Sequence, residues 1–204
     1  VVSGVSKAWR TLETQIAQVA PSQAPVLIQG ETGSGKEVVA RLVHAQSRRA
    51  AGPCIAVNCG AVSRELLESE LFGYEKGAFT GATAAKPGLI AAADGGSLFL
   101  DEVGEMPGPM QVSLLRFLDC NEYRPVGSTR TLRADVRIIC ATNRDLQELV
   151  FQGRFRDDLL YRINTVTLPV PPLRERPEDL APLVNHMLEQ FRLPGTAARI
   201  LTDR

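Results

Sequence analysis

The 204-residue sequence lacks the marks of a membrane protein and of a dedicated nucleic-acid-binding surface. It contains no apolar run long enough to span a bilayer and no secretory leader, so we expect a cytoplasmic protein without a membrane partner. Lys and Arg number 23, as do Asp and Glu, so there is no basic excess of the kind that nucleic-acid-binding domains carry. We therefore expect DNA contact only through a domain that is absent from this chain.

Cysteine and histidine are scarce, with four Cys and two His in the chain. No two cysteines form a C-x-x-C pair, which argues against a zinc site held by such a pair. We expect free thiols in a reduced cytoplasm. The cysteines are Cys54, Cys59, Cys120 and Cys140.

Short apolar runs of strand length alternate with segments of helical periodicity. The predicted strands are residues 25–29, 54–57, 97–101, 136–141 and 165–170. We predict helices over 36–47, over 63–70 with Ser63 as N-cap, and from a first turn at Pro107 through Met110, Leu114 and Leu118. This alternation predicts an α/β fold in which helices cover both faces of a parallel sheet.

The prolines at 169, 171 and 172 interrupt any regular element. We take them as the boundary between an α/β core, residues 1–172, and a helical appendage, residues 173–204. A helical stretch extends to about residue 192. We expect the appendage to be incomplete, because the chain stops after about one helix and part of another.

A glycine-rich loop follows the first predicted strand and precedes a predicted helix, the setting that G-x-x-x-x-G-K requires for phosphate binding. Glycines let backbone N–H groups approach phosphate oxygens, and the helix offers its positive N-terminus. Lys would reach the β and γ phosphates as a point charge. The expected nucleotide-binding residues are Gly30, Glu31, Thr32, Gly33, Ser34, Gly35, Lys36 and Glu37.

Glu37 departs from the general phosphate-loop motif, because Ser or Thr normally stands there and binds Mg²⁺. We expect the ion to take more of its ligands from elsewhere or from water.

The third predicted strand ends in two acids, Asp101 and Glu102. Buried carboxylates are costly unless they are paired or bind a metal. A nucleoside triphosphatase supplies the reason: Asp101 holds Mg²⁺, and Glu102 orients and deprotonates the attacking water. The alternative is that the pair only begins a turn.

Thr142 and Asn143 follow the fourth predicted strand. Because ligands of this architecture bind beyond the carboxyl ends of strands, these residues are candidates for hydrogen bonds to the γ-phosphate or the attacking water. An Asn at a strand end is also a common turn former.

These residues resemble the central domain of sigma-54-dependent transcription activators, a branch of the AAA+ ATPases. The phosphate loop ending in Glu37 matches, and three further stretches make the resemblance specific. These are FGYEKGAFTGA at 72–82, RFRDDLLYR at 154–162 and LRERPED at 173–179. The resemblance runs from about residue 4 to about residue 192.

The resemblance implies that a hexapeptide at the tip of a surface loop inserted into a helix contacts the sigma factor. Phe79 would be an exposed aromatic anchor, and Gly77 and Gly81 would let the loop move. From composition alone, a core Phe between two turn glycines fits equally well. Residues 122–127 resemble a second loop that moves with the first. The hexapeptide is Gly77, Ala78, Phe79, Thr80, Gly81 and Ala82.

The resemblance also implies catalytic roles. Asn58 matches a position that holds the catalytic Glu inactive until the loops engage. Arg156 and Arg162 match arginine fingers. Such arginines come from a neighbouring subunit and stabilise charge on the transferred phosphoryl group. ATP would then lie between the subunits of a ring, expected to be a hexamer. Taken alone, these two arginines fit a solvated helix face equally well.

One feature of the resembled family is not found. The helical lid normally carries a second sensor arginine within Gly-Asn-x-Arg-Glu-Leu, and the sequence has no such stretch. Residues 193–204 do not match the lid either, so we expect a fragment or a truncated form.

Three functions stay open at this stage. The first is an ATPase with Mg²⁺ that remodels sigma-54 RNA polymerase and so activates transcription. The second is an AAA+ motor acting on another protein, which shares the ATP site but not the hexapeptide loop. The third is a nucleotide-binding switch without catalysis, which needs neither Glu102 nor the arginine fingers.

Overall fold

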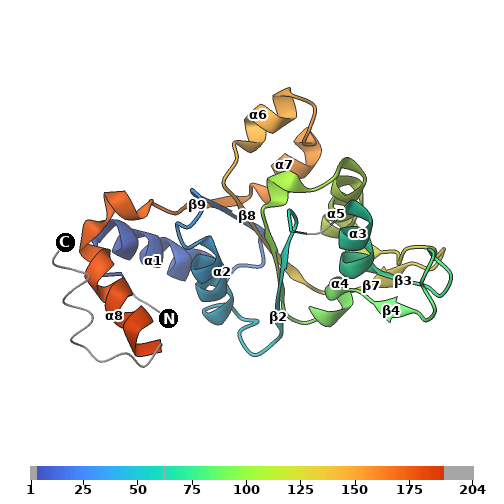
Figure 1. The fold of residues 1–204 in the computed structure, drawn as a ribbon, viewed down its shortest axis with the longest axis horizontal. Helices are drawn as coiled ribbons and strands as arrows, with labels where there is room; N and C mark the ends of the chain where they lie inside the picture. The colour runs from blue at the N-terminus through green and yellow to red at the C-terminus, as the bar shows by residue number, and fades with distance from the viewer. Residues whose placement is uncertain (1–3, 62, 191–204) are drawn as a thin grey trace.

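The computed structural model describes residues 4–61 and 63–190. Figure 1 shows the arrangement of the elements along the chain. The helices are α1 Lys7–Val19, α2 Lys36–Ala45, α3 Arg64–Phe72, α4 Leu89–Ala92, α5 Gly108–Cys120, α6 Leu146–Phe151, α7 Asp157–Ile163 and α8 Leu180–Gln190, with 3-10 turns η1 Val103–Glu105, η2 Leu173–Glu175 and η3 Pro177–Asp179. The strands are β1 Val26–Gln29, β2 Cys54–Asn58, β3 Gly73–Tyr74, β4 Lys86–Pro87, β5 Ser97–Asp101, β6 Glu122–Tyr123, β7 Leu132–Arg133, β8 Arg137–Thr142 and β9 Val166–Pro169.

A five-stranded parallel sheet forms the centre, in the order β2-β5-β8-β1-β9. The predicted parallel sheet is therefore confirmed, and each predicted strand lies within one or two residues of an observed one. The order places β8 between β1 and β5, although β8 comes last of the three in the chain. Three strands that end at predicted site residues, or directly before them, are consequently neighbours.

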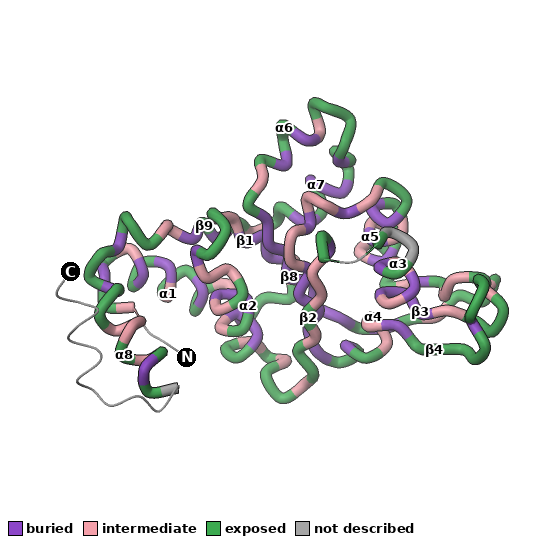
Figure 2. The backbone as a smooth tube through the Cα atoms, viewed as in Figure 1, coloured by how far each residue is buried: buried purple, intermediate pink, exposed green. Residues whose placement is uncertain are grey.

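Helices cover both faces of the sheet, which gives three layers (Figure 1). Alternate residues of each strand enter opposite cores, because successive side chains of a strand point to opposite faces. On β1, Val26 and Ile28 pack with α1 and α2, whereas Leu27 joins the core beneath α3, α4, α5 and α7. Figure 2 shows the buried residues concentrated along these central elements.

Local signals explain where the covering helices begin. Ser63 caps α3 as predicted, because its side chain accepts a hydrogen bond from the Leu66 amide. The prediction for Pro107 is wrong by one residue: Pro107 is the N-cap of α5, and Pro109 lies in the first turn. Met110 and Leu114 are fully buried, as the predicted apolar stripe requires.

Helix α1 was not predicted, and its far end depends on a distant residue. Its buried residues Trp9, Leu12 and Ile16 face the sheet. The guanidinium of Arg137, at the start of β8, donates to the carbonyls of Ala20 at 2.5 Å and Val19 at 3.1 Å. A buried cation therefore satisfies the last carbonyls of α1, which have no partner within the helix.

Two short antiparallel ribbons, β3–β4 and β6–β7, extend from the α3 and α5 side of the molecule (Figure 1). They were not predicted as strands. Figure 2 shows that the segments they carry are largely exposed.

The chain continues past the prolines into η2, η3 and α8, at the end of the molecule that also holds α1 (Figure 1). The end of the predicted appendage, residues 191–204, lies outside the described residues. Within the part of the chain that the structure describes, no helix is long and apolar enough to cross a membrane.

Candidate functional site

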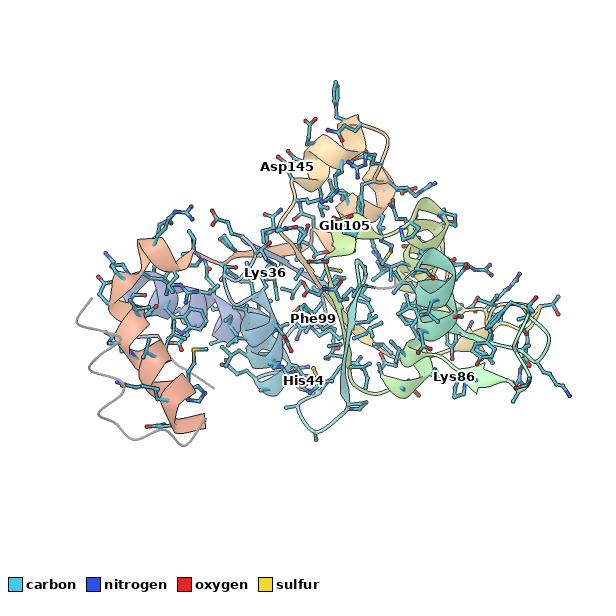
Figure 3. All side chains as sticks on the ribbon, viewed as in Figure 1. Lys36, His44, Lys86, Phe99, Glu105 and Asp145 are labelled. Atoms are coloured by element: carbon cyan, nitrogen blue, oxygen red, sulfur yellow. The ribbon has the colours of Figure 1, made fainter. Side chains whose placement is uncertain are left out.

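The predicted nucleotide residues gather where the central strands end. The last residues of β1 and β8, Gln29 and Thr142, are paired neighbours, as are Asn58 of β2 and Asp101 of β5. In Figure 3, Lys36 and Glu105 lie towards this end of the sheet, and His44, which is bonded to the first residue of β5, lies towards the other. The sheet therefore brings together residues that are far apart in sequence.

The glycine-rich loop between β1 and α2 has the backbone that only glycine adopts readily. Gly33 and Gly35 have φ angles of 78° and 96°. A Cβ on Gly30 would lie 2.7 Å from Ser34 Oγ, so the loop also closes on itself there. Gly35 is the N-cap of α2 and provides no side-chain cap. The first amides of α2 therefore have no acceptor within the helix and form a ready site for an anion.

Lys36 folds over this loop. Its Nζ donates to the carbonyls of Gly30 and Glu31, each at 2.9 Å. The ammonium group is thus held at the loop that the motif predicts to bind phosphate. Among the described residues, Ser34 Oγ is a buried side-chain oxygen without a hydrogen-bond partner.

Glu37 forms an ion pair with Arg41 on the next turn of α2, at 2.7 Å. Both side chains are more than half exposed. The residue that replaces the usual Ser or Thr is therefore engaged on the surface of the helix.

Asp101 ends β5 beside the phosphate loop. Its Oδ1 accepts a hydrogen bond from the Glu102 amide at 2.9 Å. Burial raises the pKa of the Asp101 carboxyl, while that amide and the Lys36 ammonium oppose the rise. No cluster of three metal-ligating side chains occurs among the described residues. A single carboxylate suits Mg²⁺, which keeps water and phosphate ligands in such sites.

Glu102 has a left-handed backbone, with φ 52° and ψ 44°. Such a conformation is uncommon outside glycine and clusters at functional sites. A Cβ on Gly60 would lie 2.5 Å from Glu102 Oε2 and 3.4 Å from Asn58 Oδ1. The Gly60 amide donates to Asn58 Oδ1 at 2.8 Å. Asn58 and Glu102 thus both approach the side of Gly60 that lacks a Cβ, and sequence reasoning missed this glycine.

At the end of β8, the side-chain Nδ2 of Asn143 donates to Thr32 Oγ1 of the phosphate loop at 3.0 Å. Thr142 Oγ1 accepts from the Arg144 amide at 3.0 Å. A cavity of about 510 Å³ opens here, lined by residues that include Gly30 and Asn143. The two residues predicted from the strand end therefore adjoin the loop.

Arg156 and Arg162 lie elsewhere. Arg156 is the N-cap of α7 and pairs with Asp158 at 2.6 Å. Arg162 donates to the Leu118 carbonyl at 2.9 Å and pairs with Asp119 at 3.3 Å. No hydrogen bond or ion pair of the described residues joins either arginine to the phosphate loop. Both side chains are thus bonded to groups on α5 and α7 and not to the phosphate loop of their own chain.

The hexapeptide loop lies between α3 and α4, and the ribbon β3–β4 forms its base. Phe79 is 45% exposed, and its ring centroid lies 4.9 Å from that of Tyr74 in an edge-to-face arrangement. Gly77 and Gly81 have φ angles of 82° and 102°, and a Cβ on either would meet nothing within 4 Å. The interpretation of Phe79 as a core residue is therefore wrong, since its ring reaches solvent.

The second loop contacts the first. Val126 pairs with Tyr74, accepts a hydrogen bond from the Glu75 amide at 3.0 Å and donates to the Gly73 carbonyl at 2.8 Å. A Cβ on Gly127 would lie 2.8 Å from the Ala78 Cβ. A movement of one loop would therefore displace the other.

Two arginines also contact the phosphate loop. One lies in η2, and the other directly follows η2. Arg174 pairs with both carboxylate oxygens of Glu31 at 2.6 Å, and Arg176 donates to the Ser34 carbonyl at 2.6 Å. These contacts span more than 140 residues, so no local pattern predicts them. A second cavity, of about 130 Å³, continues from the loop towards Trp9 and Leu183.

Comparison with known proteins supplies the family. The family described as Sigma-54 interaction domain matches residues 2–169. A Nif-specific regulatory protein of Herbaspirillum seropedicae is 52% identical over 199 residues, covering 98% of this chain and 37% of that protein. The regulatory protein AtoC of Escherichia coli K12 is 55% identical over 175 residues, covering 86% of this chain and 38% of that protein.

Among solved structures, NtrX from Brucella abortus in complex with ATP has a TM-score of 0.86 and 40% identity. The match covers 94% of this chain and 41% of the NtrX chain. The chain thus spans well under half the length of each of these relatives.

Proposed function

We propose, since the chain belongs to the sigma-54 interaction domain family of AAA+ proteins, that it hydrolyses ATP to remodel RNA polymerase carrying sigma-54. The observation that carries this proposal is the joint presence of a formed phosphate loop and an exposed hexapeptide loop on one domain. Neither a different AAA+ motor nor a non-catalytic switch requires both. The relatives are longer than this chain, so the activity of a whole protein is also part of the proposal.

We assign nucleotide binding to the carboxyl end of β1 and the amino end of α2. The loop amides and Lys36 would hold the phosphates. To reach them, the Lys36 ammonium group would leave the two carbonyls that it now contacts. The cavity towards Trp9 would take the base. ATP bound to NtrX, a relative with 40% identity, supports this assignment.

Asp101 would hold Mg²⁺, which neutralises charge on the phosphate oxygens when it is bound. Glu102 would accept a proton from the attacking water, and its unusual backbone aims the carboxylate from the end of β5. Thr142 and Asn143 would contact the γ-phosphate side of the site, because Asn143 already bonds to Thr32.

Asn58 would restrain Glu102 in the resting state. Both side chains lie against Gly60, so a small shift of β2 relative to β5 would change their separation. This provides a route from the nucleotide to the surface, because α3 and the hexapeptide loop follow β2 in the chain.

Arg156 and Arg162 would act on the nucleotide of a neighbouring copy. Their contacts on α5 and α7 leave them away from their own phosphate loop, so an arginine finger here requires another subunit. We therefore propose a ring, with six copies as the expected number. Residues 1–172 would form its α/β core, and residues 173–204 would begin a helical lid.

The residues Gly77 to Ala82 would contact sigma-54, with Phe79 as the anchor. Its ring leans on Tyr74 and remains half exposed, so it is available to a partner without loss of core packing. The contact with the second loop at Val126 would let both loops respond together.

Phe79→Ala tests the proposal. Its ATP turnover should stay within about twofold of wild type, because the Phe79 side chain lies outside the ATP site. Transcription from a sigma-54 promoter should be lost. Leu66→Ala on α3, where the residue is 47% exposed, is the matched control and should retain both activities. Transcription retained by Phe79→Ala would contradict the sigma-54 contact, and a wild-type chain that never turns over ATP would contradict the enzyme.

A further inference from the structure

The segment after the prolines returns to the middle of the phosphate loop. The Arg176 side chain is only 7% exposed, and its Nη2 donates to the Ser34 carbonyl at 2.6 Å. Its Nε donates to the Pro171 carbonyl at 3.1 Å. One guanidinium thus connects two backbone segments that lie more than 130 residues apart in the sequence. The proposed ATP chemistry assigns no role to this buried cation.

The surroundings of Arg176 are built around its charge. The guanidinium stacks over the Trp9 ring, with its central carbon 4.8 Å from the ring centroid. Asp179 is fully buried, and its carboxylate lies 3.8 Å from Nη1 of Arg176. The same carboxylate accepts bonds from the amides of Val5 and Ser6, at 2.6 and 2.7 Å. The start of α1, the η3 turn and the phosphate loop are therefore linked through one ion pair.

The position of the Ser34 carbonyl decides where the loop presents its next amide. A trans peptide is planar, so the carbonyl oxygen of Ser34 and the N–H of Gly35 point in opposite directions. Arg176 holds the oxygen on the side of Trp9. The Gly35 N–H is therefore turned away from Trp9, and Gly35 accepts this orientation because its φ angle of 96° costs a glycine little.

We infer that Arg176 is a positioning residue for the phosphate loop, which fixes the Ser34–Gly35 peptide so that its amide faces the nucleotide phosphates. This inference rests on the proposed nucleotide site. It makes phosphate affinity depend on the contact between the loop and the 173–179 segment. Lysine cannot replace arginine here, because it lacks the planar fork that reaches two carbonyls while stacking on an aromatic ring.

Arg174 provides a control in the same segment. It also contacts the phosphate loop, but through the Glu31 carboxylate, and its side chain is 66% exposed. Surface ion pairs of this kind contribute little to stability. Arg137 provides a second control, because it too is a buried arginine that donates to backbone carbonyls, but at the opposite end of α1.

The experiment measures binding of Mg-ADP and of inorganic pyrophosphate to the 204-residue chain by calorimetry. Arg176→Lys and Arg176→Gln should each weaken both ligands by a similar factor, roughly tenfold or more, as expected for loss of one charge-assisted hydrogen bond. Arg174→Gln should change either affinity by less than about fivefold. Arg137→Lys should lower the unfolding midpoint yet leave both affinities unchanged at a temperature where the chain is folded.

Three results would overturn the inference. Wild-type affinity for both ligands in a folded Arg176→Lys chain would show that the peptide does not need the guanidinium. Weakened ADP with unchanged pyrophosphate would place Arg176 on the base instead of behind the loop. A wild-type chain that binds neither ligand would remove the proposed nucleotide site itself, and the inference with it.

Discussion

Replacing Gly60 with alanine should impair hydrolysis without loosening the fold. The backbone of Gly60 lies outside the left-handed region, so alanine is compatible with its conformation. The new Cβ would lie 2.5 Å from Glu102 Oε2, whereas real Cβ contacts under 3.0 Å are essentially never seen. Because the clash is with the end of a flexible side chain, the carboxylate moves and the backbone stays.

The size of that movement sets the expected effect. Glu102 Oε2 must retreat by about half an ångström to reach 3.0 Å, and by about 0.9 Å to reach ordinary contact at 3.4 Å. A misplacement of about 1 Å costs a catalytic group on the order of 10²-fold in rate. We therefore expect turnover to fall roughly 10- to 100-fold, with ADP affinity within about twofold of wild type.

The assay is phosphate release at saturating Mg-ATP, at the protein concentration that gives maximal specific activity. Gly108→Ala is the matched control, since a Cβ there meets nothing within 4 Å, and it should match wild type. Glu102→Gln supplies the lower limit of activity. Full turnover by a folded Gly60→Ala chain would refute the assignment of Glu102 as the base at this position.

The remaining predictions concern stability, pH and the proposed ring. Arg137→Met should lower the free energy of unfolding in urea by about 3 kcal/mol, because the carbonyls at the end of α1 lose their donors; a loss under about 1 kcal/mol would contradict that. Burial lowers the pKa of His44 below its usual 6.5, so the unfolded chain binds the extra proton first. The stability from neutral His44 should be complete above pH about 6.5 and decline as pH falls towards the folded pKa, a slope that His44→Gln should reduce in urea titrations at several pH values. Arg162→Ala should cut turnover on the order of 10³-fold in assembled rings with ADP affinity retained, and near-normal turnover would exclude it as a finger.

Local patterns were sufficient for much of the fold and for the phosphate loop. Strand β1, the glycines after it and Lys36 are adjacent in sequence, so their spacing already predicts their geometry. The carboxyl end of β5 could be predicted to hold Asp101 near the loop, because strand ends meet at one edge of a parallel sheet. Helix α1 was missed although Ser6, Trp9 and Leu12 offered a cap and the beginning of an apolar face.

Other features depend on contacts that no local pattern encodes. The bond from Arg176 to the Ser34 carbonyl spans 142 residues, and that from Arg137 to Ala20 spans 117. Gly60 likewise matters only because Glu102 approaches it from another strand. Sequence reasoning therefore named the residues that are proposed to bind the nucleotide, and the structure was needed to see the contacts that hold these residues in place.

The strand order has a consequence for the way in which the molecule is made. Among the described strands, β1 pairs with β8 and β9 alone, whereas β2 and β5 can pair with each other earlier. At ribosomal speeds of roughly 5–20 residues per second, β1 waits roughly 6 to 20 s for β8 to be synthesised. During that interval the apolar residues of β1 have no neighbour in the sheet. The loop at the end of β1 is thus expected to be one of the last parts of the site to become ordered on a nascent chain.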